Sequence, residues 1–301
     1  MAKEKEHFEV MLAGIKRNKY LSKEEQTDWV KYLECSMKHI KWEQPVLKFF
    51  LTENENVTEN IRFRDLWSII DSNGWLEDVI LDSVLYHYFD KKKIGYINTS
   101  LVQAIESSFL SEDTPTPFKN DKDGYVALKN INKDHWIFVY ISFKDKTFYV
   151  VDSLYRNLVQ EAKQIVQSFQ KVHHNELNTN KKSKWNFIDH SWKIANIDHT
   201  PQKDNSNCGI ICIQYAVKVL DCHPNVPARL TFDKDMDSMR QYLTALLLYH
   251  CREMNLKVTK GDGNLRKHVL DRSKVGKSLN SNDNTSIGTK RKRIPRIKLS
   301  L

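Results

Sequence analysis

The chain has 301 residues, 40% of them hydrophobic and 11% aromatic, so it can bury a sizeable core and is not disordered throughout. Its five cysteines are few and odd in number, which favours free thiols in a reducing compartment over a disulfide framework. The first residues, MAKEKEHFEV, are charged, and no apolar run reaches the ~18 residues of a membrane span. We therefore expect an intracellular protein that is neither secreted nor membrane-spanning.

The net charge of +9 is concentrated at one end of the chain. Residues 257–301 hold 13 of the 47 basic side chains and 3 of the 38 acidic ones, and no aromatic residue follows position 258. Such a composition predicts a disordered basic tail over 257–301. Its cluster Lys290, Arg291, Lys292 and Arg293 could bind a nuclear import receptor or make weak nucleic-acid contacts. We expect a nuclear and/or cytoplasmic location.

The N-terminal region, residues 1–54, reads as a helical extension. Ser22 and Glu25 have the spacing of a capping box, and Trp29, Leu33 and Met37 follow at helical intervals. Pro45 interrupts this pattern, and the polar stretch TENENVTEN over 52–60 then suggests a boundary. A second domain is expected over 55–256.

Helices and strands are mixed in the second region. Residues 124–130, 135–143 and 147–152 are rich in β-branched and aromatic residues and predict three strands, and 192–197 predicts a fourth. Apolar spacing predicts helices over about 80–88, 155–172, 208–221 and 234–253. The predicted fold class is α+β.

The stretch QKDNSNCGII, residues 202–211, places Cys208 where a polar loop becomes an apolar helix. The N-terminus of a helix stabilises a thiolate, which is the reactive form of cysteine. His135 begins one predicted strand and Asp152 ends the next, so antiparallel pairing could bring the carboxylate to the imidazole. A nucleophile, a base and a group that orients the base are the parts of a cysteine hydrolase.

These segments resemble the ubiquitin-like-protein-specific cysteine proteases, the SUMO protease family. The resemblance is carried by DHWIFVYISFKDKTFYVVDSL and PQKDNSNCGIICIQYA, by Trp75-Leu76-Glu77-Asp78, by Ile61 to Leu66, and by Asp235, Met236 and Arg240. These stretches run in the family's order from about residue 58 to 253. The family has a papain-like fold, in which helices flank a small mixed sheet and the nucleophile begins a central helix.

The resemblance also implies the roles of individual residues. His135 would be the general base, Asp152 its orienting partner, Cys208 the nucleophile and Gln202 the oxyanion donor. Trp75 and Trp136 would close a tunnel over the Gly-Gly tail of a ubiquitin-like modifier, most often SUMO. The implied reaction is hydrolysis of peptide or isopeptide bonds after that tail, and no cofactor is expected.

Other interpretations remain open. Cys208, Cys212, Cys222 and His223 have poor spacing for zinc, and a zinc-bound thiolate could not attack a carbonyl, so no metal is expected. His199 is a rival base without a strand-borne partner. Related viral and mobile-element proteases cut polyproteins, and related acetyltransferases share the order of His, acid and Cys. A non-enzymatic nuclear interaction module with a nucleic-acid-binding tail is the alternative of a different class.

Overall fold

The computed structural model describes residues 2–39, 41–50, 58–107, 121–155, 158–178 and 191–253. The predicted tail over 257–301, with its basic cluster at 290–293, lies outside these residues and stays a prediction. The same is true of the predicted boundary at residue 54. Among the described helices, none is both long and apolar enough to cross a membrane.

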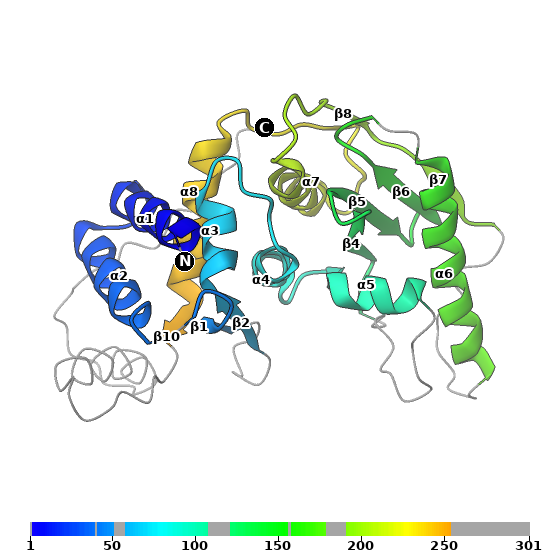
Figure 1. Cartoon of the computed structure of the whole chain (residues 1–301). Coiled ribbons are helices and arrows are strands. Elements are labelled where there is room, and N and C mark those ends of the chain that lie inside the picture. The colour runs from blue at the N-terminus through cyan, green and yellow to red at the C-terminus, as the bar shows by residue number, and fades with distance from the viewer. Residues whose placement is uncertain are drawn as a thin grey trace, which may run out of the picture.

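A five-stranded sheet forms one half of the molecule (Figure 1). Its order is β3 (Ile94–Ile97), β4 (Gly124–Ile131), β5 (His135–Ser142), β6 (Thr147–Val151) and β7 (Lys193–Ala195). The pairs β4–β5 and β5–β6 are antiparallel, whereas the outer strands β3 and β7 pair in parallel. The three strands predicted over 124–152 and the shorter β7 are thereby confirmed.

Helices cover both faces of this sheet. On one face α5 (Thr99–Glu106) and α6 (Val159–Asn178) pack over alternate apolar residues such as Ile137, Val139 and Phe148. On the other face α7 (Cys208–Cys222) lies against β5, and α4 (Asp78–Phe89) packs on α7. Because every residue of β5 is buried, this central strand has apolar side chains toward both layers. The arrangement confirms the α+β class.

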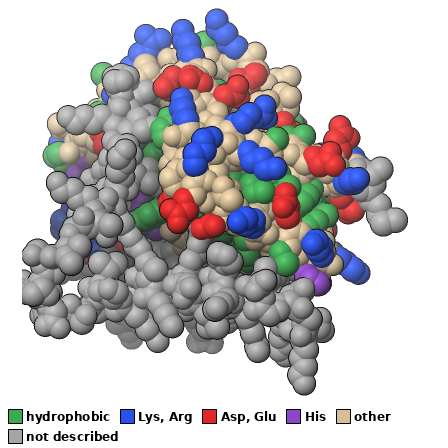
Figure 2. All heavy atoms as spheres, turned by 90° about the vertical axis from the view of Figure 1, so that its left-hand side faces the viewer, with side chains coloured by type: hydrophobic (Ala, Val, Ile, Leu, Met, Phe, Trp, Pro, Cys, Tyr) green, Lys and Arg blue, Asp and Glu red, His purple; other side chains and the backbone are tan. Residues whose placement is uncertain are grey.

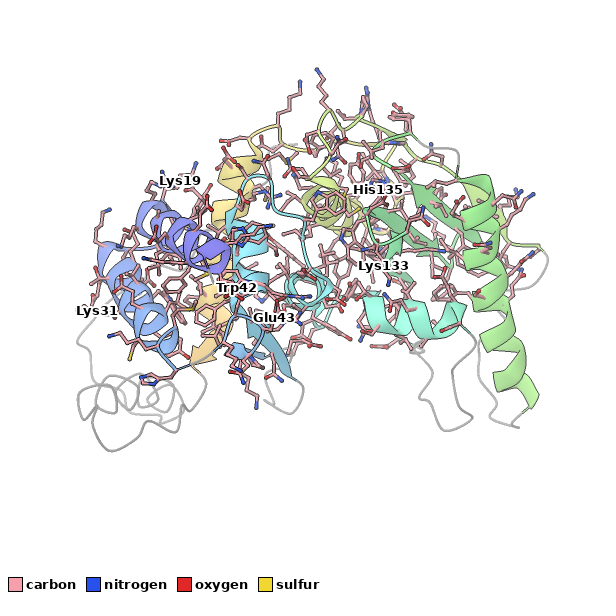
Figure 3. All side chains as sticks on the ribbon, in the orientation of Figure 1. Lys19, Lys31, Trp42, Glu43, Lys133 and His135 are labelled. Atoms are coloured by element: carbon pink, nitrogen blue, oxygen red, sulfur yellow. The ribbon has the colours of Figure 1, made fainter. Side chains whose placement is uncertain are left out.

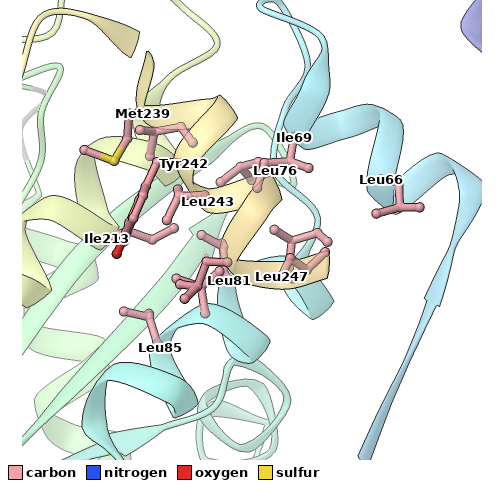
Figure 4. Close-up of a cluster of buried hydrophobic side chains, with 14 of the residues drawn as sticks. Leu66, Ile69, Leu76, Leu81, Leu85, Ile213, Met239, Tyr242, Leu243 and Leu247 are labelled. Carbon is pink, nitrogen blue, oxygen red and sulfur yellow. The ribbon is translucent and has the colours of Figure 1, made fainter. Parts of the chain in front are cut away.

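The other half of the molecule is built around α8 (Met236–His250) and α3 (Phe63–Ile70), with α1 (Ala2–Arg17) and α2 (Lys23–Ser36) outside them (Figure 1). Leucines of α8 pack with Leu66, Ile69 and Leu81 in one continuous core (Figure 4). Phe8, Met11 and Ile15 of α1 belong to the same core. The N-terminal helices are therefore packed onto the rest of the protein.

The capping box that the sequence predicts is present at α2. The Ser22 side chain accepts from the Glu25 backbone N–H at 3.2 Å, and the Glu25 carboxylate accepts from the Ser22 N–H at 2.7 Å. Two of the four N–H groups left unpaired at a helix start are satisfied in this way.

The helical interpretation of residues 1–54 is wrong for its last part. Residues 45–50 form strand β1 (Pro45–Phe50), which pairs antiparallel with β2 (Thr58–Arg62) and with β10 (Cys251–Glu253). The predicted last helix accordingly ends at His250 instead of 253. Val46, Leu47 and Phe49 of this strand are buried, and its conformation is decided by two partner strands, one of which lies about 200 residues away in the sequence.

The short sheet β8 (Asp198–His199) and β9 (Arg229–Leu230) lies beside the middle of α7, where the Tyr215 hydroxyl donates to the Thr200 carbonyl at 3.0 Å. The face of α1 and α2 carries lysine and arginine side chains interspersed with acidic ones (Figure 2). This mixture agrees with the near neutrality of the chain before residue 257.

Candidate active site

The β4–β5–β6 meander brings a histidine and a carboxylate together. His135 is the first residue of β5, directly after the tight turn in which Asn132 and Lys133 have positive φ (Figure 3). Phe138 pairs with Val151, so the next residue, Asp152, continues the register opposite Ile137, which lies two residues beyond His135. Such diagonal neighbours on antiparallel strands are within reach of long side chains. Asp152 Oδ1 lies 2.5 Å from His135 Nε2, and both side chains are buried.

The environment of His135 favours its charged form. Burial lowers the pKa, but hydrogen bonds with Asp152 and Cys208 and the negative charges of both groups outweigh it and raise the pKa of His135 to about 9. Because Nε2 faces Asp152, the imidazole is held with its other nitrogen, Nδ1, available to Cys208. An imidazolium between a carboxylate and a thiol is the arrangement in which the thiol is held as a thiolate.

Cys208 is the first residue of α7 and is only 3% exposed. Its sulfur accepts a hydrogen bond of 3.5 Å from the Trp136 backbone N–H, next to His135. One turn later the Cys212 thiol donates to the Trp136 carbonyl at 3.5 Å, and burial raises the pKa of Cys212 well above its usual range. Cys212 is therefore a neutral packing residue, whereas Cys208 faces the histidine.

The loop before Cys208 is shaped by Asp204. Its Oδ1 accepts from the backbone N–H groups of Ser206 at 3.0 Å and Asn207 at 2.9 Å. Partial burial favours the neutral carboxyl, but these backbone hydrogen bonds outweigh it and lower the pKa of Asp204. Asp204 therefore stabilises the local turn.

Both the oxygen and the nitrogen of the Gln202 side-chain amide form hydrogen bonds within the protein. Oε1 accepts from the Ser153 hydroxyl at 2.7 Å, and Nε2 donates to Asp204 at its carbonyl (2.7 Å) and at Oδ1 (3.1 Å). Both Nε2 hydrogens are therefore engaged within the loop. To serve an oxyanion, Nε2 must exchange one of these bonds, and the longer one to Asp204 Oδ1 is the weaker.

The two tryptophans are connected through Leu76. Trp136 is buried, and its indole Nε1–H donates to the Leu76 carbonyl at 3.0 Å. Trp75, the residue before Leu76, is 46% exposed, which is unusual for so large an apolar side chain. Leu76 in turn packs against Gly209, where an added Cβ would stand 3.1 Å from the Leu76 Cβ. The Trp75 turn is thus seated directly on the start of α7.

The structure adds residues whose roles the sequence does not reveal. His199, considered above as a rival base, has Nε2 at 2.8 Å from the Asp152 carbonyl and Nδ1 at 2.8 Å from the Ile197 carbonyl, and it stacks on Tyr155. It therefore supports the backbone of Asp152 and does not face Cys208. The Ser153 hydroxyl donates to the Gln202 side chain. The only sequence signal for this role is that Ser153 directly follows Asp152. Arg240 lies buried behind the loop before Cys208, where its Nε donates to Asn207 Oδ1 at 3.1 Å.

No group of three His, Cys, Asp or Glu side chains that could hold a metal ion occurs in the part of the chain that the structure describes. Cys222 and His223, considered above with Cys208 as zinc ligands, lie at the far end of α7. His223 instead pairs with Asp123 at 3.1 Å. At Cys208 the structure brings together a thiol, an imidazole and a carboxylate.

Solved structures with a similar fold are SUMO proteases. The Ulp1-like SUMO protease catalytic domain of Chaetomium thermophilum aligns with a TM-score of 0.53 at 15% identity, covering 76% of this chain and 90% of that one. A SUMO protease Ulp1 whose catalytic cysteine is a sulfenic acid gives 0.50 at 20% identity, covering 74% and 94%. The Ulp1 protease domain in complex with Smt3, the yeast ortholog of SUMO, also gives 0.50 at 20% identity, covering 74% and 95%. At these identities the likeness establishes the fold.

The comparison with curated protein sequences gave no match. The sequence model of the Ulp1 protease family, C-terminal catalytic domain, matches residues 78–253, which is more than half of the chain and includes His135, Asp152 and Cys208. The chain therefore belongs to the Ulp1 protease family and is a cysteine peptidase.

Proposed function

We propose that this protein hydrolyses the bond after the Gly-Gly tail of a ubiquitin-like modifier, with SUMO as the modifier. The observation that carries the proposal is the buried His135–Asp152 pair, 2.5 Å apart, beside a thiol at a helix N-terminus. Support for the modifier comes from the Trp75–Leu76 turn, which the Trp136 indole and Gly209 fix next to that thiol. In the proposed complex the two indoles cover the tail and leave a slot that admits glycine and excludes larger residues.

In the proposed mechanism Cys208 attacks as a thiolate, with His135 as the imidazolium. The sulfur forms a bond with the carbonyl carbon of the terminal glycine, and the carbonyl electrons move to the oxygen. The resulting oxyanion accepts hydrogen bonds from the Cys208 backbone N–H, which points outward at the helix start, and from Gln202 Nε2. Gln202 reaches it by exchanging its bond with Asp204 Oδ1.

Collapse of this intermediate breaks the bond between carbon and nitrogen. His135 gives its proton to the leaving amine, so the products are a free amine and a thioester at Cys208. His135, now neutral, takes a proton from water, and the hydroxide equivalent attacks the thioester. The modifier leaves with a carboxylate, and the thiolate–imidazolium pair is restored. Asp152 keeps one ring orientation through both steps and stabilises the imidazolium.

Removal of a modifier from a lysine and maturation of a precursor are both hydrolysis after the same tail. The same site can perform both, because it contacts the tail and the reacting carbonyl, and the leaving group differs only in being a lysine or a peptide amine. A test uses two substrates with one modifier, an isopeptide conjugate and a C-terminally extended precursor. Cleavage of both by wild type and of neither by Cys208→Ala is expected, and peptide cleavage without response to any modifier would contradict the modifier assignment.

A further inference from the structure

Arg240 is a buried cation on α8 directly behind the nucleophile loop. Its side chain is only 2% exposed, although burial of a charge is costly unless that charge is paired. Nε and Nη2 donate to Asn207 Oδ1 at 3.1 and 2.9 Å. Nη1 donates to the Ser68 carbonyl at 2.9 Å, and Nη2 also donates to the Gly74 carbonyl at 2.7 Å and the Ser206 carbonyl at 3.4 Å.

All of these acceptors are neutral. Among the described residues no carboxylate forms an ion pair with Arg240, so its charge is solvated by dipoles and not cancelled by direct contact. Burial lowers the pKa of Arg240 to about 10, and the more distant Asp71, Asp237 and Asp204 and the Cys208 thiolate oppose this change. The guanidinium is therefore still charged at neutral pH.

The acceptors lie on three separate segments that meet at the active site. Ser68 belongs to α3, Gly74 precedes Trp75, and Ser206 and Asn207 precede Cys208. One planar guanidinium with five N–H donors fixes the spacing between the turn that carries Trp75 and the loop that carries Cys208. The same side chain places a positive charge, in direct contact with neutral acceptors only, behind the loop that leads into Cys208.

We propose that Arg240 is a positioning residue with an electrostatic function: it joins the Trp75 turn to the Cys208 loop, and its buried charge favours the Cys208 thiolate. This inference rests on the proposed role of Cys208 as nucleophile. The interaction is reciprocal, because a thiolate that favours the charged guanidinium is favoured by it to the same extent.

The other ionisable groups around Cys208 set the background against which this effect is measured. His135 and Asp152 face it from β5 and the end of β6, Cys212 follows it on α7, and Asp204 lies in its loop. Asp71 and Asp237 act on Arg240 from the end of α3 and the start of α8. None of these groups changes in the variants used for the test, which differ from wild type only at Arg240.

The test measures the rate of iodoacetamide alkylation at Cys208 against pH, read by mass spectrometry on the peptide that contains it. Arg240→Met removes the charge and the donors, whereas Arg240→Lys keeps the charge and loses the planar fork. We expect both variants to melt at lower temperature than wild type. The midpoint of the alkylation profile moves to higher pH by about 0.5 unit or more in Arg240→Met, while Arg240→Lys stays near wild type.

Equal midpoints in wild type and Arg240→Met, or equal shifts in Met and Lys, would overturn the electrostatic part of the inference. Arg240→Gln provides a second measurement if Arg240→Met does not fold, because its amide still donates hydrogen bonds but carries no charge. A midpoint at higher pH, as in Arg240→Met, is expected; a wild-type midpoint contradicts the inference.

The wild-type profile separates this inference from the proposed function. If Cys208 in wild type is alkylated no faster at neutral pH than an ordinary thiol, the nucleophile assignment fails. If wild type is reactive at neutral pH and the variants share its profile, only the role of Arg240 fails.

Discussion

The Asp152 carboxylate lies 2.5 Å from Nε2 of His135, and both side chains are removed from solvent. This one contact links β5 to the end of β6 and fixes which ring nitrogen faces Cys208. Together with Cys208 it also favours the charged form of the histidine, so the proposed catalytic activity depends on it.

Asp152→Asn is expected to keep the fold and to abolish most of the activity. The amide has nearly the same shape, but it cannot stabilise an imidazolium and it can favour the wrong tautomer. A loss of about 10²–10⁴ in kcat is expected with little change in KM. Steady-state cleavage of a modifier fused to a fluorophore measures both constants. Ser153→Ala is the matched control at the neighbouring position. It leaves the His135–Asp152 pair in place and removes only the hydroxyl that binds Gln202.

The raised pKa of His135 predicts a stability that depends on pH. The pKa is about 9 in the folded protein against an ordinary value of 6.5. The folded state therefore holds the proton more tightly, and this stabilisation is complete below about pH 6.5 and is lost as pH rises through about 9. Thermal melting at intervals from pH 6 to 10 should show the decline. His135→Gln should flatten this part of the profile, and an equally steep decline in that variant would show that another group is responsible.

Substitution of Trp75 and substitution of Trp136 should have different effects on stability and on cleavage. Trp75 is 46% exposed, so Trp75→Ala is expected to leave the melting temperature within a few degrees of wild type while greatly weakening cleavage of the modifier fusion. Trp136 is buried, so Trp136→Ala should reduce both stability and cleavage. Wild-type cleavage by Trp75→Ala would argue against its place over the tail.

We expect that position 209 must be glycine because the turn that carries Trp75 packs against it. The backbone conformation of Gly209 itself does not require glycine. A Cβ at this position meets the buried Leu76 at 3.1 Å, and Leu76 accepts the hydrogen bond from the Trp136 indole. Gly209→Ala should therefore reduce activity about tenfold with only a small change in melting temperature, because alanine also favours the helix by up to about 1 kcal/mol. Combination with Leu76→Gly, which removes the Cβ, Cγ and Cδ1 atoms that the added Cβ meets and keeps the Leu76 carbonyl, should restore part of the activity. No recovery would contradict this steric explanation.

Local sequence patterns predicted most of the elements around the site. Alternating β-branched and aromatic residues gave β4, β5 and β6, and Ser22 with Glu25 gave the start of α2, because these signals depend on near neighbours. The strand β1 was missed since its partners β2 and β10 include a segment some 200 residues away. His135, Asp152, Gln202 and Cys208 could be named because the resemblance aligned them in order.

Residues that act from behind the site could not be found in the same way. Arg240 was visible only as part of a helix motif, and its acceptors at Ser68, Gly74 and Asn207 are backbone or amide groups on three distant segments. His199 looked like a possible base because sequence position gives no information on where a ring points. In the structure its Nε2 faces the Asp152 carbonyl.

The most direct test of the central claim is covalent labelling with SUMO that carries a vinyl sulfone in place of its terminal carboxylate. The account predicts one adduct per chain, located at Cys208 by peptide mapping, slowed strongly in His135→Gln and absent in Cys208→Ala. A folded wild-type protein that forms no adduct at Cys208, or forms one at Cys35 or Cys222 instead, would contradict it.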